Sequence, residues 1–339
     1  MAALDTSCLV GPVAFKDLNW KDEGEMETAP PDESADDIVA SLPSNTTGPN
    51  LELRQYQGVW MLGTVVPGLI SLQRHFRSRP GDVLLASPVK SGTTWIKSLT
   101  FATMARFSYP PCAADHPLRR LNPHECVPYM EEVFLHGQEA KLEALPSPRI
   151  MHTHLHYSLL PRSLAKCKTV FVCREPKDMV VSLWHFLNRA GVNFSFSEVI
   201  ELICDGKNPN GPFWDHVLGY WRASKVRPDG VLFVRYEKML VDPVSTVREL
   251  GRFLGVPFSA AEEAAELPME ICKLCSFDTM RGLQGNKTGS TGEFNFAHQS
   301  YFRKGIVGDW VNHMTPKTAR RIDTTVEEKL RGSGLTFTS

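Results

Sequence analysis

A short segment near residue 90 carries the clearest sign of chemistry in this 339-residue chain. Residues 88–95 read Pro-Val-Lys-Ser-Gly-Thr-Thr-Trp and follow an apolar run at residues 83–87. A glycine between a strand and a helix permits a sharp turn, after which the free N–H groups of the helix start point at an anion. Lys90 adds a positive charge, and hydroxyl donors come from Ser91, Thr93 and Thr94. The segment therefore predicts a cradle for phosphate or sulfate oxygens.

The order of residues in this cradle differs from that of an ATP-binding P-loop. The P-loop pattern GxxxxGK[ST] has its lysine after the last glycine, whereas Lys90 precedes Gly92. A kinase or nucleotide hydrolase that uses ATP and Mg²⁺ stays an alternative, but this order argues against it.

Three histidines alternate at positions 152, 154 and 156. In an extended strand, all three side chains would face one side. An imidazole can accept a proton from a hydroxyl near neutral pH, which suits a general base. Three imidazoles could also hold zinc with one open position, as in a zinc hydrolase. The spacing alone leaves both interpretations open.

Apolar runs at residues 83–87, 169–173 and 231–235 are predicted to be buried strands, and each precedes a helix-like segment. Pro176, Asp242-Pro243 and Thr315-Pro316 mark expected helix starts. Continuous apolar strands that alternate with helices are typical of a parallel sheet covered on both sides. We therefore predict a single α/β domain with a central parallel sheet flanked by helices and a P-loop-like nucleotide-binding core.

Charge is unevenly distributed along the chain. Residues 1–50 hold ten Asp and Glu against two Lys, a net charge of −8, so the remainder carries +7 to give the whole chain its −1. We expect residues 1–50 to be an acidic, mostly disordered leader and residues 51–339 to form the domain. Apolar residues at 42% and charged residues at 22% exclude a fibrous or wholly disordered chain.

The N-terminal residues lack the pattern of a secretory signal, and the apolar stretch 59–72 is interrupted by Pro67 and is too short to span a bilayer. We therefore expect a cytoplasmic protein that has neither a membrane nor a nucleic acid as a partner. The eight cysteines should then be reduced, and the lone Cys272-x-x-Cys275 pair is a weak indication of a zinc or redox site.

Residues 90–95 resemble the donor-binding loop of the cytosolic sulfotransferases, Tyr-Pro-Lys-Ser-Gly-Thr-Thr-Trp, with Pro88-Val89 in place of Tyr-Pro. Residues 303–310, Arg-Lys-Gly-Ile-Val-Gly-Asp-Trp, match that family's Arg-Lys-Gly-x-x-Gly-Asp-Trp completely. The segments 182–186 and 211–221 resemble the plant members in particular. The resemblance covers roughly residues 80–310, in the family's order.

The resemblance implies that the chain transfers a sulfuryl group from 3′-phosphoadenylyl sulfate (PAPS). The implied donor-binding residues are Lys90, Ser91, Gly92, Thr93, Thr94, Trp95, Arg174, Ser182, Tyr236, Cys275, Ser276, Phe277, Arg303, Lys304 and Gly305. Arg174 and Ser182 would hold the 3′-phosphate, whereas Trp95 and Phe277 would stack on the adenine with Tyr236 nearby. Cys275 stands where the family more often has Thr.

The resemblance also implies how catalysis would occur. His154 matches the family's base and would take the proton of the acceptor hydroxyl. Lys90 would stabilise the departing phosphate, and Ser182 would hold Lys90 back until the acceptor binds. No metal is implied, and His152 stands where many animal members have Lys. A relative that binds the nucleotide without catalysis stays an alternative.

The acceptor implied by the resemblance is a small hydroxylated molecule. Flavonoids, steroids, hydroxyjasmonate, desulfoglucosinolates and strigolactone-like compounds stay open. We expect the pocket walls to come from residues 108–150 and 285–300. The dimer motif of animal members, Lys-x-x-x-Thr-Val-x-x-x-Glu, aligns with Val311, Thr315, Pro316 and Arg320, so we expect a monomer or a weak dimer.

Overall fold

The computed structural model describes residues 11–18, 33–47, 51–292 and 295–337. At its centre is a four-stranded parallel sheet in the order β5-β4-β6-β7. Its strands are β4 (Val83–Ala86), β5 (Ile150–Thr153), β6 (Lys168–Cys173) and β7 (Val231–Arg235). The three predicted strands, the parallel sheet and the α/β class are thus confirmed.

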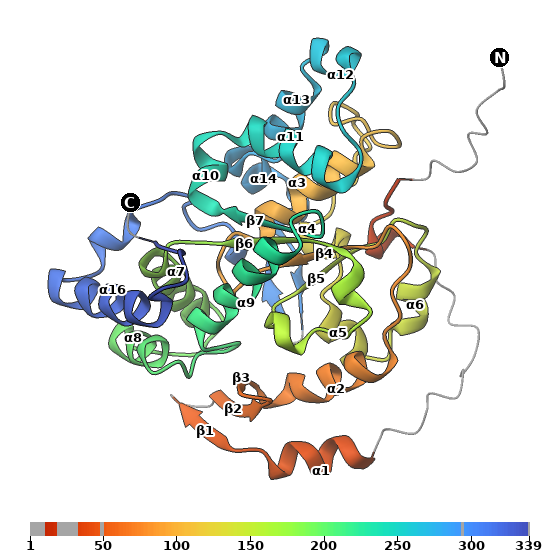
Figure 1. The fold of residues 1–339 in the computed structure, drawn as a ribbon. Helices are drawn as coiled ribbons and strands as arrows, with labels where there is room; N and C mark the ends of the chain where they lie inside the picture. Colours follow the sequence, from red (N-terminus) through yellow and green to blue (C-terminus); the bar gives the residue numbers. More distant parts are fainter. Residues whose placement is uncertain (1–10, 19–32, 48–50, 293–294, 338–339) are drawn as a thin grey trace.

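The sheet is buried because helices cover both of its faces (Figure 1). Val83 and Leu85 of β4 face a core shared with α3 (Thr93–Ala105) and α11 (Pro243–Leu254). Leu84 and Ala86 point to the opposite face, where α2 (Val66–His75), α5 (Met130–Leu135) and α7 (Pro176–Arg189) supply the packing. This alternation explains why the strands are apolar at every position.

The predicted helix starts are also confirmed. α7 (Pro176–Arg189), α11 and α16 (Pro316–Leu330) each begin with proline, and the residue before it accepts a backbone hydrogen bond from the first turn. Gly255, at φ +84°, ends α11 in the left-handed conformation that favours glycine. Local capping chemistry therefore sets these boundaries.

The expectation that ordered structure begins near residue 51 is wrong. Within the first fifty residues, the structure describes 11–18 and 33–47, which include α1 (Glu33–Ser41) and β1 (Ser44–Thr47). β1 pairs antiparallel with β2 (Leu51–Tyr56), which pairs with β3 (Val59–Leu62). Composition misses this segment because its stability comes from pairing with β2. The rest of the predicted leader lies outside the described residues.

The segments 108–150 and 255–300 contain several short elements rather than long helices. The remaining helices and strands are α2 (Val66–His75), α4 (Pro123–Cys126), α5 (Met130–Leu135), α6 (Glu139–Ala144), α8 (Phe196–Cys204), α9 (Phe213–Val226), α10 (Tyr236–Val241), α12 (Ala260–Ala264), α13 (Leu267–Leu274), α14 (Phe277–Gly282), α15 (Gln284–Lys287), β8 (Ser290–Thr291) and β9 (Phe296–Ala297). Among the helices that the structure describes, none combines the length and apolarity needed to cross a membrane.

Candidate active site

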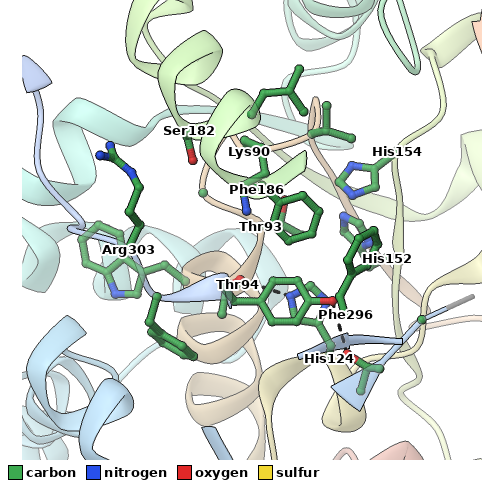
Figure 2. A pocket seen from close by; sticks show the side chains of 18 of the residues that line it. Lys90, Thr93, Thr94, His124, His152, His154, Ser182, Phe186, Phe296 and Arg303 are labelled. Atoms are coloured by element: carbon green, nitrogen blue, oxygen red, sulfur yellow. Dashed lines mark hydrogen bonds between the residues drawn. The ribbon is translucent and has the colours of Figure 1, made fainter. Parts of the chain in front are cut away.

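A large cavity opens at the carboxyl ends of the parallel strands. The residues that line it include Lys90 after β4, His154 after β5, Arg174 after β6 and Tyr236 after β7. Segments far apart in the chain thus meet because parallel strands end at one edge of the sheet. Figure 2 shows Lys90, His154, Ser182 and Arg303 around this cavity.

The structure brings together nearly all of the predicted site residues. Those that line the cavity are Lys90, Gly92, Thr93, Thr94, Trp95, His154, Arg174, Ser182, Tyr236, Cys275, Phe277, Arg303, Lys304 and Gly305. Ser91 is not among them, and its buried hydroxyl has no hydrogen-bond partner in the part of the chain that the structure describes. Ser276 is not among them either, because its hydroxyl caps α14 by accepting a hydrogen bond from the Thr279 N–H.

The loop after β4 has a backbone conformation that depends on glycine. Gly92 lies at φ +108°, and a Cβ there would come within 2.7 Å of the Tyr236 ring. Lys90, at φ +63°, is also left-handed. The Ser87 and Thr93 hydroxyls lie 2.7 Å apart and tie the loop to the end of β4. These features leave the backbone N–H groups at the start of α3 facing the cavity.

The Lys90 ammonium lies 3.8 Å from the centre of the Phe186 ring. Phe186 is one helical turn beyond Ser182 on α7. Burial, followed by the charges of Arg174, Arg189 and Arg303, lowers the pKa of Lys90 to about 7. An anion in the cavity would favour the protonated ammonium.

Two cations of the segment 303–310 share one carboxylate. Arg303 Nη1 donates to Asp309 Oδ2 at 2.5 Å, and Lys304 Nζ donates to Asp309 Oδ1 at 2.7 Å. Burial opposes ionisation of Asp309, yet the hydrogen bonds from Lys304 and Arg303 hold its pKa well below the ordinary range. Asp309 therefore stays ionised and fixes both cations at the cavity.

A second buried carboxylate, that of Asp178 on α7, anchors the same segment. Its oxygens accept the N–H of Gly308 at 2.7 Å and the N–H of Trp310 at 3.0 Å. Arg174 lies 3.6 Å from this carboxylate. No sequence motif assigned a role to Asp178, although its position between Arg174 and Ser182 was a usable signal.

The aromatic residues predicted to hold the adenine lie at the wall of the cavity. Trp95 packs edge-on against Tyr236, with ring centroids 5.7 Å apart. Phe277 lies against Gly305, where an added Cβ would meet the Phe277 ring at 2.5 Å. Gly305 is also left-handed, at φ +68°, so only glycine lets the chain pass so close to the ring. Stacking of a purine between Trp95 and Phe277 stays a prediction.

The tautomer of His154 follows from its hydrogen bond. Nδ1 lies 2.7 Å from the Ser87 carbonyl oxygen, which can only accept, so Nδ1 carries the proton and Nε2 keeps its lone pair. The backbone N–H of His154 donates to Glu131 Oε1 at 3.0 Å, which fixes the chain just after β5. Burial is the main cause that lowers the pKa of His154 to about 4, so the ring is neutral at pH 7.

The expectation that His152, His154 and His156 face one side is wrong, because β5 ends at Thr153 and the alternation ends with it. His152 lies beside His154, with ring centroids 4.5 Å apart, and burial lowers its pKa well below the usual value. His156 instead bonds the Asn210 carbonyl at 3.0 Å. The described part of the chain contains no cluster of three or more His, Cys, Asp or Glu arranged to hold a metal.

The opposite part of the cavity wall is apolar. The predicted wall segments contribute the aromatic rings of Tyr129 and Phe296, together with the carboxyl group of Glu132. The other apolar wall residues, which were not predicted from the sequence, are Leu51, Leu62, Val65, Leu183, Leu187 and Val192. Leucine and valine carry no chemical signature that distinguishes a pocket wall from a core, so no motif indicated them.

A family model described as a sulfotransferase domain matches residues 80–334, and the chain belongs to this family. Cytosolic sulfotransferase 8 of Arabidopsis thaliana is 41% identical over 324 residues, which cover 94% of this chain and 97% of that protein. Cytosolic sulfotransferase 12 of the same plant is 38% identical over 309 residues, 89% of this chain and 93% of that protein. The predicted resemblance to the plant members is thereby confirmed.

Solved structures show the same fold. A crystal structure of a putative steroid sulphotransferase of Arabidopsis thaliana has a TM-score of 0.72 at 35% identity, covering 89% of this chain and 94% of that one. A mouse sulfotransferase complexed with PAP, the desulfated nucleotide, has a TM-score of 0.63 at 28% identity, covering 83% and 96%. The predicted P-loop-like nucleotide-binding fold is confirmed as that of the sulfotransferases.

Proposed function

We propose that this protein transfers the sulfuryl group of PAPS to a hydroxyl of a small apolar acceptor in the cytoplasm. The observation that carries the proposal is one cavity with two chemically different parts. Arg174, Arg303 and Lys304 supply positive charge to one part, whereas leucine and valine side chains line the other. His154 and Arg303 lie on opposite sides of this cavity in Figure 2. The PAP complex of the mouse relative supports PAPS as the sulfuryl donor.

His154 is the proposed general base. Its Nε2 lone pair is free because Nδ1 donates to the Ser87 carbonyl. The acceptor hydroxyl would give its proton to Nε2 while its oxygen forms a bond to sulfur and the bond from sulfur to the phosphate oxygen breaks. A base that is neutral at pH 7 in a buried site is ready to take that proton.

Lys90 is proposed to stabilise the negative charge that grows on the departing phosphate oxygen. Its ammonium lies over Phe186 near Ser182, so a small side-chain movement would bring it to the donor. Stabilisation of charge where it develops lowers the barrier more than it improves ground-state binding. Since the sulfuryl group carries only one negative charge, we expect this transfer to proceed without a metal.

The acceptor is proposed to be apolar around its hydroxyl. Leu62, Val65 and Leu187 would bury an uncharged carbon skeleton, and such burial is worth about 25 cal/mol for each Å². The Arabidopsis relative of known structure is described as a putative steroid sulphotransferase, and a steroid is a largely apolar molecule, which agrees with this proposal.

The experiment is a transfer assay with ³⁵S-labelled PAPS and a panel of apolar and polar hydroxyl compounds, run in parallel with and without EDTA. We expect label on one or more apolar hydroxyl compounds, and equal rates with and without EDTA. Binding of PAP without transfer to any compound would favour the non-catalytic alternative. Turnover of ATP with Mg²⁺ in place of PAPS would contradict the proposal.

A further inference from the structure

A chain of hydrogen bonds runs from the interior of α3 to the cavity wall. Lys97 Nζ lies 3.1 Å from His124 Nδ1 and 3.1 Å from the Val127 carbonyl oxygen. His124 Nε2 lies 3.1 Å from Thr94 Oγ1. Lys97 is completely buried, whereas His124 and Thr94 line the cavity (Figure 2). Removing a cation from water costs desolvation free energy, which hydrogen bonds offset only in part. The proposed mechanism gives no role to Lys97 that would explain this burial.

The chemistry of the three groups fixes the direction of the chain. Burial lowers the pKa of Lys97 to about 7. In its protonated form Lys97 has three N–H donors and no acceptor, so His124 Nδ1 then accepts from Lys97. The single proton of the neutral His124 ring then sits on Nε2, which donates to Thr94 Oγ1. Burial, followed by the charge of Lys97, lowers the pKa of His124 well below its usual value, which keeps the ring neutral.

Two further contacts hold this arrangement in place. The His124 ring stacks on Tyr301 with centroids 4.1 Å apart and planes 21° apart. The backbone N–H of His124 donates to Asn122 Oδ1 at 3.0 Å, at the start of α4. Within the described residues, His124 is the one hydrogen-bond partner of the Thr94 hydroxyl. The hydroxyl hydrogen of Thr94 is therefore left for a ligand.

We propose that Lys97 and His124 are positioning residues that orient the Thr94 hydroxyl as a donor toward the phosphate or sulfate oxygens of the nucleotide. This inference rests on the proposed function. It explains why a lysine is buried behind a loop that already carries Lys90: Lys97 acts through the imidazole and does not touch the ligand. Because charge grows on the leaving oxygen during transfer, the oriented hydroxyl contributes more to turnover than to nucleotide binding.

The test compares Lys97→Met, Thr94→Val and the double variant, with kcat from the transfer assay and the Kd of PAP from calorimetry. We expect each single variant to lose about 10-fold in kcat, because Thr94→Val removes the hydroxyl donor and Lys97→Met removes the group that orients it. The double variant should lose at most about 2-fold more than Thr94→Val alone, because both act through one chain. Thr94→Ser keeps the hydroxyl and should stay within about 3-fold of the wild type.

Thr100→Val is the matched control on the same helix. Thr100 is fully buried, and its hydroxyl has no hydrogen-bond partner among the described residues, so this variant should keep the wild-type kcat. Wild-type kcat in Lys97→Met, or single-variant losses that multiply in the double variant, would overturn the inference.

His124 gives a second comparison that does not depend on the folding of Lys97→Met. In His124→Gln, the amide oxygen can accept from Lys97 while the NH₂ group donates to Thr94, whereas His124→Leu breaks the chain. We expect His124→Gln to keep at least about a third of the wild-type kcat and His124→Leu to lose about 10-fold. Equal losses in the two variants would overturn the inference. Failure of the wild type itself to bind PAP would instead overturn the proposed function, so the two failures are distinguishable.

Discussion

The two parts of the cavity differ in how they are built. The part proposed to bind the nucleotide consists of charged and polar groups on short contiguous motifs, and several of them are fixed by a hydrogen-bonding partner, as Arg303 and Lys304 are by Asp309. The acceptor part consists of apolar side chains from segments as distant as Leu51 and Val192, which contact one another through packing alone. Hydrogen bonds and ion pairs are directional, so they hold a fixed geometry that suits one ligand. The shape of a packed apolar wall instead changes when its residues are substituted.

His154 is the proposed base for the acceptor hydroxyl and is not part of the nucleotide site. His154→Ala should therefore give the largest difference between the effect on turnover and the effect on nucleotide binding. We expect turnover to fall by about 10²- to 10⁴-fold, the usual contribution of a general base. The Kd of PAP should stay within about 2-fold, because His154 is not among the groups proposed to hold the nucleotide. The transfer assay and calorimetry on one preparation measure both values. Normal turnover in this variant would remove the base assignment.

Lys90→Met should show that the nucleotide part acts on the transition state. Methionine keeps most of the side-chain volume but removes the ammonium that lies over Phe186. We expect kcat to fall by about 10²- to 10³-fold, as when one donor to a developing negative charge is removed. The Kd of PAP should rise far less. A larger change in Kd than in kcat would reduce Lys90 to a binding group.

Gly305→Ala should weaken the nucleotide part alone. The new Cβ would meet the Phe277 ring at 2.5 Å, so the loop or the ring must move. We expect the Kd of PAP to rise about 10-fold through this displacement. Gly308→Ala is the matched control, since Gly308 is also left-handed at φ +83° but an added Cβ there would meet no described residue within 4 Å. Equal changes in the two variants would show that backbone strain, not the contact with Phe277, decides affinity.

Leu62→Asn should affect the acceptor part alone. A polar amide in an apolar wall disfavours an apolar acceptor, and we expect its KM to rise about 10-fold. The Kd of PAP should not change, because Leu62 belongs to β3, outside the motifs that carry the charges. Leu62→Met preserves the apolar character and should resemble the wild type. A parallel rise in the Kd of PAP would show that the two parts are not independent.

The pH dependence of nucleotide binding should be the smallest effect. The pKa of Lys90 is about 7 in the free protein, and its protonated form binds the anion, so affinity should fall as the pH rises above 7. We expect the Kd of PAP to rise about 5-fold from pH 7 to pH 8, a loss that Lys90→Met reduces. Calorimetry at several pH values measures the slope. A Kd that is constant from pH 7 to pH 9 would show that the Lys90 ammonium does not contribute to binding of the nucleotide.

The difference between the two parts also explains what the sequence could predict. Strands β4, β6 and β7 and the start of α7 were predictable because apolar runs, proline and capping residues act locally. The nucleotide motifs were predictable because charged residues and glycines at fixed spacing have few other uses. β1 and the apolar wall were not, because pairing and packing between distant segments leave no local pattern. The hydroxyl of Ser276 caps α14, and binding of the nucleotide by Ser276 stays a prediction.

The three histidines at positions 152, 154 and 156 show why alternation along a strand can mislead a prediction. Alternation suggested three imidazoles on one face, but the strand ends at Thr153, and the hydrogen bonds of each ring decide its direction. Where a strand ends depends on its neighbours in the sheet, and in this case also on the Glu131 carboxylate, which binds the His154 N–H. A period of two is informative only as far as the extended backbone continues.

Calorimetric titration of the folded wild-type protein with PAP is the most direct test of the central claim. We expect saturable one-to-one binding that PAPS competes away, and weaker binding when Arg303 and Lys304 are both replaced by alanine. Absence of binding by a protein whose circular dichroism shows the native helix content would contradict it.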